Sequence, residues 1–257
     1  MVAGLAFLAT AVATVFAQAT GVRFSRSKAP HQGAWTFALA LFALASAALA
    51  TAASTGWDRG TFRAFYLLGA VLNVPWLALG TIYLLGGRKW GDRVRTGLVL
   101  FTGFAIGVML AAPIHGAIAR DGGIPVGKDH FGVLPRVLAG AGSGVGAIVV
   151  FGGALYSAIR FARRRVPGTG SLAGGNALIA LGTLVLSSGG LLQGAVGQDE
   201  GFTISLAAGI VVVYAGFVVA SSRPRPAAGA DESERRRSLP ANERGSESTT
   251  STRVGSL

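Results

Sequence analysis

Side chains suited to metal binding or proton transfer gather at residues 119–136 and 199–200. Carboxylates and imidazoles are common ligands of divalent cations and common acids and bases of hydrolytic enzymes. We define a candidate external cluster that consists of Asp121, Asp129, His130, Asp199 and Glu200. It would bind a cation or a partner if the fold brought these groups together, because functional groups are often carried by loops on a rigid scaffold. The alternative is that they are ordinary solvated loop residues without a function.

A second candidate interrupts the apolar run "LLGAVLNVPWLALGTIYLLGG", residues 67–87. Pro75 has no N–H to donate to the carbonyl of Val71, so a helix is expected to kink here and the carbonyl needs another partner. Asn73 is expected to face neighbouring helices at the same depth. We define a candidate midplane polar site that consists of Asn73, Pro75, Trp76, Thr81 and Asn176. A packed kink and a binding cavity both explain the pattern.

The sequence lacks the residues that other kinds of catalysis require. The chain has no cysteine, which excludes disulfides, thiolate metal sites and cysteine nucleophiles. A three-histidine hydrolase is excluded because His31 falls on the opposite side of the predicted bundle from His115 and His130. The last apolar segment has no lysine for a retinal Schiff base. We therefore predict no catalytic residue, cofactor or metal, and an enzyme at the membrane interface stays open only through the external cluster.

Long apolar segments must position these groups. The chain has 257 residues, 51% of them hydrophobic and 13% charged, and about 20 apolar residues suffice for a helix to cross a bilayer. Seven segments qualify: residues 2–20, 35–54, 61–86, 97–119, 132–161, 172–193 and 202–222. We predict an all-α polytopic membrane protein, a bundle of seven transmembrane helices over residues 1–222. Residues 223–257, rich in Arg, Ser, Glu and Pro, are predicted to form a disordered basic tail.

The loop charges predict an orientation. One side of the seven-span arrangement, together with the tail, holds 18 basic and 6 acidic residues, and the other side holds 5 of each. Because Lys and Arg accumulate in cytoplasmic loops, we predict that the N-terminus is outside and the C-terminus cytoplasmic in a multi-pass protein of the cell membrane. The positive charge then faces the anionic lipids of the inner leaflet, so it does not indicate nucleic-acid binding.

Glycines at four-residue spacing predict close helix packing. In "GAGSGVG", Gly140 pairs with Gly144 and Gly142 with Gly146, and small residues at this spacing allow two helices to approach. Packing inside the bundle is the simpler interpretation, because a bundle already supplies neighbours. Packing against a second copy, in a homo-oligomer, is the alternative.

The membrane part also resembles a known family. The stretches "GAWTFALALFALASAALA", "DHFGVLPRVLAGAGSGVGAIVVFGGALYSAIR" and "GNALIALGTLVLSSGG", within about residues 33–222, are similar to an uncharacterised family of seven-helix integral membrane proteins from high-GC Gram-positive bacteria. The resemblance implies the seven-helix topology. It implies no ligand, cofactor or site residue.

Two functions are compatible with these patterns. The first is a non-enzymatic receptor-like or accessory module, which acts through a protein partner or as a homo-oligomer. The alternative is a carrier or channel for a small neutral or amphipathic solute, because the kinked segment around Asn73 is a typical place for a transport path. A polar cavity that reaches Asn73 from either side would favour transport.

Overall fold

The apolar stretches form long helices, which satisfy the backbone hydrogen bonds within each segment. The structure, a computed structural model, describes residues 1–118, 123–163, 170–196 and 199–221, with the backbone only at 170–172 and 190–196. The elements are α1 (Val2–Ser27), α2 (Pro30–Thr55), α3 (Arg59–Phe65), the π-helix η1 (Tyr66–Asn73), α4 (Val74–Ala111), α5 (Gly127–His130), α6 (Val133–Arg163), α7 (Gly170–Val196) and α8 (Asp199–Ser221). Within these residues the extended pairing is one isolated bridge between Ile114 and Phe131, and there is no strand.

Length and composition suit these helices to a membrane. Five of the described helical stretches are long and apolar enough to cross one: Val2–Ser27, Pro30–Thr55, Arg59–Ala111, Val133–Arg163 and Asp199–Ser221. The stretch Arg59–Ala111 has 53 residues and contains a sharp reversal, and a shorter apolar helix covers Ala173–Gly189. The protein is therefore all-helical, with five to seven helices apolar enough to span a membrane.

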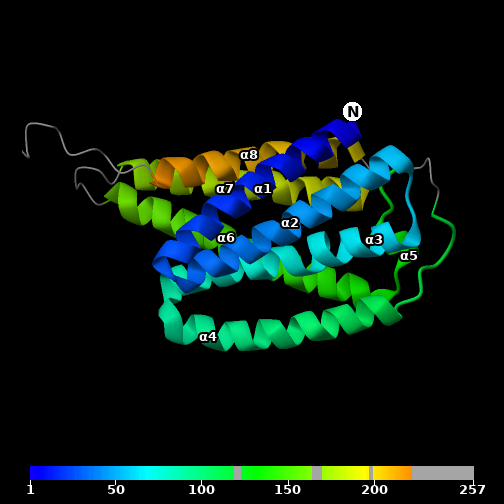
Figure 1. Ribbon diagram of the computed structural model, residues 1–257, viewed down its shortest axis with the longest axis horizontal. Helices are drawn as coiled ribbons and strands as arrows, with labels where there is room; N and C mark the ends of the chain where they lie inside the picture. Colours follow the sequence, from blue (N-terminus) through cyan, green and yellow to red (C-terminus); the bar gives the residue numbers. More distant parts are fainter. Residues whose placement is uncertain (119–122, 164–169, 197–198, 222–257) are drawn as a thin grey trace, which may run out of the picture. The chain divides into compact units, whose positions relative to one another are not determined.

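The reversal within α4 lies at Gly87. Its backbone has φ 78° and ψ 178°, a region that is essentially restricted to glycine. Figure 1 shows α4 doubling back at this point. The two arms pack antiparallel, and Trp76 Nε1 donates a hydrogen bond to Thr102 Oγ1 at 3.1 Å between them. Residues 74–111 therefore form two helical arms that are joined at Gly87 as a helical hairpin.

The second arm of α4 ends at Ala111, whereas the apolar pattern predicted a helix to residue 119. Ala112 has extended backbone angles, φ −63° and ψ 126°. The ring of Pro113 disfavours the helical conformation in the residue before it, which explains the early end. The last turn is capped by Arg63, whose Nη1 and Nη2 donate to the carbonyls of Leu110 and Ala112 at 2.7 and 2.8 Å.

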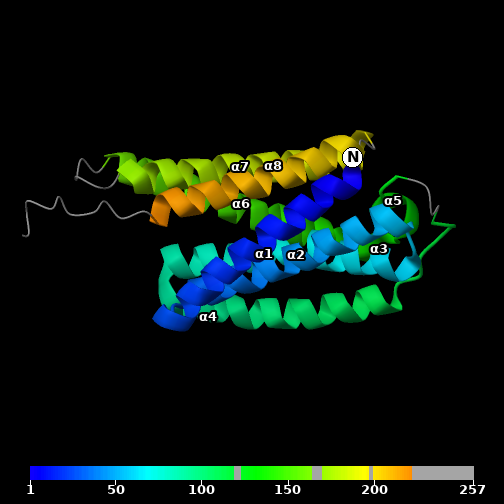
Figure 2. The ribbon, with the colours of Figure 1, turned by 45° about the horizontal axis from the view of Figure 1, so that its top comes forward.

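The long helices pack in a continuous series of neighbours. Helix α1 contacts α2 and α8, α2 contacts η1 and α4, these two contact α6, and α7 lies between α6 and α8. Figures 1 and 2 show the α1–α2 pair beside α8 on one side and beside the α3–α4 segment on the other. The kinked segment is therefore enclosed by α2 and α6.

Small residues allow the closest approaches. A Cβ added to Gly175 or Gly182 of α7 would lie 2.6 Å from the carbonyl oxygen of Gly216 or 2.9 Å from that of Gly209 in α8. In α6, Gly142 and Gly146 face the kinked segment, whereas a Cβ on Gly140 or Gly144 would have nothing within 4 Å. One glycine pair of the "GAGSGVG" motif therefore packs inside the bundle, and the other lies on its outer surface.

The two ends of the bundle differ in charge. One end contains the α1–α2 turn, the bend at Gly87 and the end of α6, and Arg23 Nη1 donates to Ser221 Oγ of α8 there at 2.5 Å. Among the described residues this end, which we call the basic end, carries nine Lys and Arg residues and one acid, Asp92. The opposite end carries four basic and four acidic residues within the described ranges.

Candidate functional site

The described members of the external cluster have separate structural contacts. Asp199, the first residue of α8, accepts a hydrogen bond from the backbone N–H of Ile124 at 2.7 Å. His130 Nδ1 lies 3.0 Å from the carbonyl oxygen of His115, and its ring packs edge-on against Phe62 at 5.5 Å. Asp129 belongs to the short helix α5, and Glu200 is exposed in the first turn of α8.

These contacts fix chain segments to one another. The Asp199 carboxylate holds the loop that leads to α5, and the α8 N-terminus favours a negative charge at this position. Within the described ranges, no group of three or more His, Asp or Glu side chains is arranged to hold a metal ion. Asp121 lies outside the described residues.

The kink of the candidate midplane polar site is filled by α6. Asn73 ends the π-helix η1 and its side chain is buried, with 9% of the residue exposed. Ser143 Oγ of α6 donates to the carbonyl oxygen of Ala70 at 2.5 Å, which supplies a partner from outside the irregular turn. A Cβ added to Gly142 would lie 2.9 Å from the carbonyl oxygen of Val71 and 3.2 Å from Pro75 Cγ. The backbone of α6 therefore occupies the space that the kink opens.

The other members of the midplane site point elsewhere. Trp76 and Thr81 line two different hollows, one against α1 and α2 and one against α6. Asn176 is half-buried in α7, whose main neighbours among the described elements are α6 and α8. The structure thus brings Asn73, Pro75 and α6 together, and does not gather the five residues into one site.

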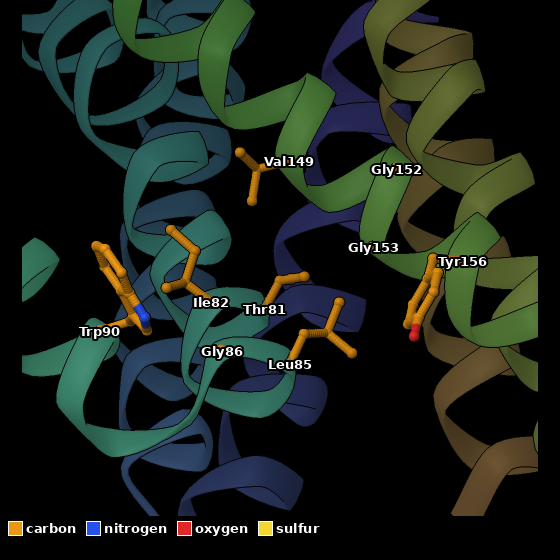
Figure 3. Close-up of a pocket in the computed structure, with 9 residues that line it drawn as sticks. All are labelled: Thr81, Ile82, Leu85, Gly86, Trp90, Val149, Gly152, Gly153 and Tyr156. Carbon is orange, nitrogen blue, oxygen red and sulfur yellow. The ribbon is translucent and has the colours of Figure 1, made fainter. Parts of the chain in front are cut away.

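The first hollow, which we call the lateral groove, has a volume of about 400 Å³ and lies between the first arm of α4 and α6. Figure 3 shows Trp90 at one side and Tyr156 at the other, with Thr81, Leu85 and Gly153 between them. Its lining is almost entirely carbon, and it opens to the side of the bundle. It lacks the convergent polar groups that orient a small ligand.

The second hollow, which we call the basic pocket, has a volume of about 410 Å³ at the basic end. It lies between the α1–α2 turn and the two arms of α4. Its lining combines aromatic and basic side chains with smaller apolar residues: Phe24, Trp76, Tyr83, Lys28, Arg88 and Arg95, together with Pro30, Gly33, Ala34 and Leu79. Of these, the sequence interpretation singled out Trp76 alone. No local sequence signal identifies the others, because the pocket forms only where the α1–α2 turn and the α4 bend meet.

The carboxylate of Asp92 lies close to both arginines of this pocket. Asp92 Oδ2 lies 3.7 Å from Arg88 Nε, and Asp92 Oδ1 lies 3.6 Å from Arg95 Nη2. The hydroxyl of Tyr83 donates to Asp92 Oδ1 at 2.7 Å. One carboxylate therefore lies near two guanidinium groups beside the pocket, which leaves an excess of positive charge there.

The protein is all-helical and suited to a membrane, and an aromatic and basic cavity lies at its basic end. Comparison of the chain with protein-family models, with curated proteins and with solved structures gave no match. The family resemblance seen in the sequence accordingly stays a prediction.

Proposed function

We propose that the chain is a seven-crossing protein of the cell membrane that acts as a non-enzymatic receptor-like or accessory module. In this proposal the hairpin at Gly87 makes Arg59–Ala111 cross twice, and α7 supplies a further crossing. Each helix then runs antiparallel to the next along the chain. This arrangement agrees with the topology implied by the resemblance to seven-helix proteins of high-GC Gram-positive bacteria.

The charge difference between the ends supports an orientation. With nine basic residues and one acid at the basic end of the described bundle, that end is the cytoplasmic one in our proposal. The N-terminus is then outside, and residues 223–257 form a cytoplasmic tail. Anionic lipids of the inner leaflet, and a protein partner or a second copy, are the expected partners, and nucleic acid is not.

The close packing around Asn73 is the observation that favours a non-enzymatic module over a carrier. A transport path through the third crossing would need space beside Asn73 and the freed carbonyls of the kink. Instead, Gly142 and Ser143 of α6 lie against Val71 and Ala70. The two hollows described above lie nearer the basic end, and each opens at the surface.

Reconstitution tests this choice. The purified full-length protein is placed in liposomes, and the uptake of a small neutral solute such as glycerol and the exchange of fluorescent lipid between leaflets are measured. We expect the rates of protein-free liposomes. In parallel, affinity purification in mild detergent is expected to retain a reproducible protein partner or a second copy.

A solute flux that Asn73→Leu abolishes would support the carrier alternative and overturn the module. Thr81→Val is the matched control, because Thr81 lies on the same helix but faces the lateral groove. A monomer that retains no partner and conducts no solute would contradict both functions.

A further inference from the structure

The basic pocket combines an apolar interior with cations at its opening. Ala34, Trp76 and Leu79 lie at least a helical turn away from the bends, and Lys28 and Arg88 lie at the bends themselves. The volume of about 410 Å³ falls within the range of roughly 300–1,000 Å³ that is usual for small-molecule sites. Its shape and polarity suit a ligand with one charged and one apolar end.

The charge at the opening is positive. Lys28, Arg88 and Arg95 line the pocket. The carboxylate of Asp92 lies more than 3.5 Å from both Arg88 and Arg95. The Arg88 side chain is 83% exposed and the Arg95 side chain 56% exposed, so both can turn toward a bound anion. A phosphate or carboxylate accepts the two-pronged hydrogen bonding that guanidinium groups offer.

The start of α2 adds to this preference. Pro30 and Gly33, in the first turn of this 26-residue helix, line the pocket, and no side chain caps the helix. A helix N-terminus carries a partial positive charge. Pro30 has no N–H and the N–H of Gly33 donates to the carbonyl of Ala29 at 3.4 Å, so the contribution is that of the helix dipole. The start of α2 therefore adds to the positive potential that the arginines and the lysine produce in the pocket.

Two glycines hold the aromatic walls in place. A Cβ on Gly91 would lie 2.1 Å from the Tyr83 ring, and a Cβ on Gly33 would lie 3.0 Å from the Phe24 ring. Both rings thus rest directly on a helix backbone. The aromatic walls of the pocket therefore have fixed positions, as a specific site requires.

We propose that the basic pocket binds an amphipathic anion, with its phosphate or carboxylate group at Lys28, Arg88 and Arg95 and its apolar chain against Trp76 and Leu79. An anionic phospholipid of the surrounding bilayer and a free single-chain amphiphile present the same chemistry. The inference goes beyond the proposed function and does not depend on the orientation of the chain. A basic surface that only interacts with solvent or controls topology would need neither the aromatic walls nor the cavity.

Binding of dodecyl phosphate to the full-length protein, purified in a neutral maltoside detergent, tests the proposal. The readouts are the shift in melting temperature and the number of molecules retained in native mass spectrometry. The double variant Arg88→Gln/Arg95→Gln removes two cations from the pocket. The matched control, Lys89→Gln/Arg160→Gln, removes two cations from the same end of the bundle outside the pocket.

We expect one retained molecule and a raised melting temperature in the wild type and in the control. The pocket double variant is expected to bind at least roughly tenfold more weakly, a loss of about 1.4 kcal/mol or more, because it lacks both guanidinium groups that would bond the anion. Equal binding by the two double variants would overturn the proposal, since overall charge would then be sufficient. Equal stabilisation by added uncharged dodecanol and by dodecyl phosphate would also overturn it.

Lys28→Asn keeps the test valid if the double variant fails to fold. Lys28 has φ 53°, a left-handed conformation that asparagine adopts readily. This variant is expected to keep the wild-type melting temperature without ligand and to bind dodecyl phosphate more weakly; unchanged binding would count against the proposal. Competition by phosphatidylglycerol vesicles, but not by phosphatidylcholine vesicles, would identify a bilayer lipid as the source, and competition by decanoate alone would identify a free amphiphile.

Discussion

Gly142 of α6 lies against the carbonyl oxygen of Val71, so closely that a Cβ at Gly142 would stand 2.9 Å from that oxygen. Val71 is the residue whose carbonyl loses its usual helical donor at Pro75. The neighbouring Ser143 donates to the carbonyl of Ala70. The proline kink and the glycine-rich stretch of α6 are therefore two halves of one interface.

Gly142→Ala is expected to lower the melting temperature of the purified protein in detergent. The added methyl group meets a backbone oxygen that cannot move without disturbing η1, and overpacking of this kind typically costs about 1–3 kcal/mol. Scanning fluorimetry measures the change. The Gly146→Ala variant, whose Cβ would lie 2.9 Å from backbone and side-chain atoms of Val74, should behave similarly.

Gly140→Ala and Gly144→Ala are the matched controls, because nothing lies within 4 Å of a Cβ at either position. Alanine is favoured over glycine within a helix by about 1 kcal/mol, so these variants should melt at the wild-type temperature or above it. If all four variants melted alike, α6 would not pack on the kink as described.

Gly87→Ala is expected to destabilise the α4 hairpin. The angles at Gly87, φ 78° and ψ 178°, are those of a region closed to other residues, and the strain amounts to about 1–3 kcal/mol. Gly86→Ala is the control, since its Cβ would make an ordinary contact of 3.5 Å with Trp90 Cβ. A fall in melting temperature for Gly87→Ala alone is the expected result, and equal melting of the two variants would contradict the sharp reversal.

Asp199→Ala is expected to release the loop before α5. The carboxylate accepts the hydrogen bond of the Ile124 N–H at 2.7 Å, and its loss should increase the hydrogen–deuterium exchange of residues 123–126. Glu200→Ala removes the same charge from the adjacent, exposed position and should leave the exchange unchanged. Equal hydrogen–deuterium exchange of residues 123–126 in the two variants would contradict the structural role of Asp199.

The helical class of the protein and the positions of its apolar helices were accessible from the sequence, because a run of apolar residues is itself the cause of a membrane-suited helix. The helix boundaries were less accessible. α2 begins at Pro30, although the apolar run begins near residue 35, since proline is well suited to the first position of a helix and the helix starts before the first apolar side chains. The end of α4 at Ala111 depends on Pro113, a local effect that an apolar count does not register.

Contacts between segments that are far apart in the chain could not be predicted from the sequence. Arg63 lies near the start of a predicted span, where a reach toward the interface is expected, but it caps the end of α4 instead. The π-helix around Asn73 is associated with Gly142 and Ser143, about 70 positions further along the chain. The basic pocket joins residues 24–34, 76–88 and 95, and no local pattern indicates that these stretches meet.

In the proposed arrangement Arg59–Ala111 crosses the membrane twice and the basic end is cytoplasmic. Because the chain has no cysteine, single cysteines at Ser25, Lys89, Thr55 and Ala117, all exposed positions, can each be labelled with an impermeant maleimide in intact cells. We predict that Thr55→Cys and Ala117→Cys react in intact cells and that Ser25→Cys and Lys89→Cys react only after permeabilisation. Labelling of Thr55→Cys and Ala117→Cys from opposite sides would contradict the double crossing, and labelling of Lys89→Cys in intact cells would contradict the orientation.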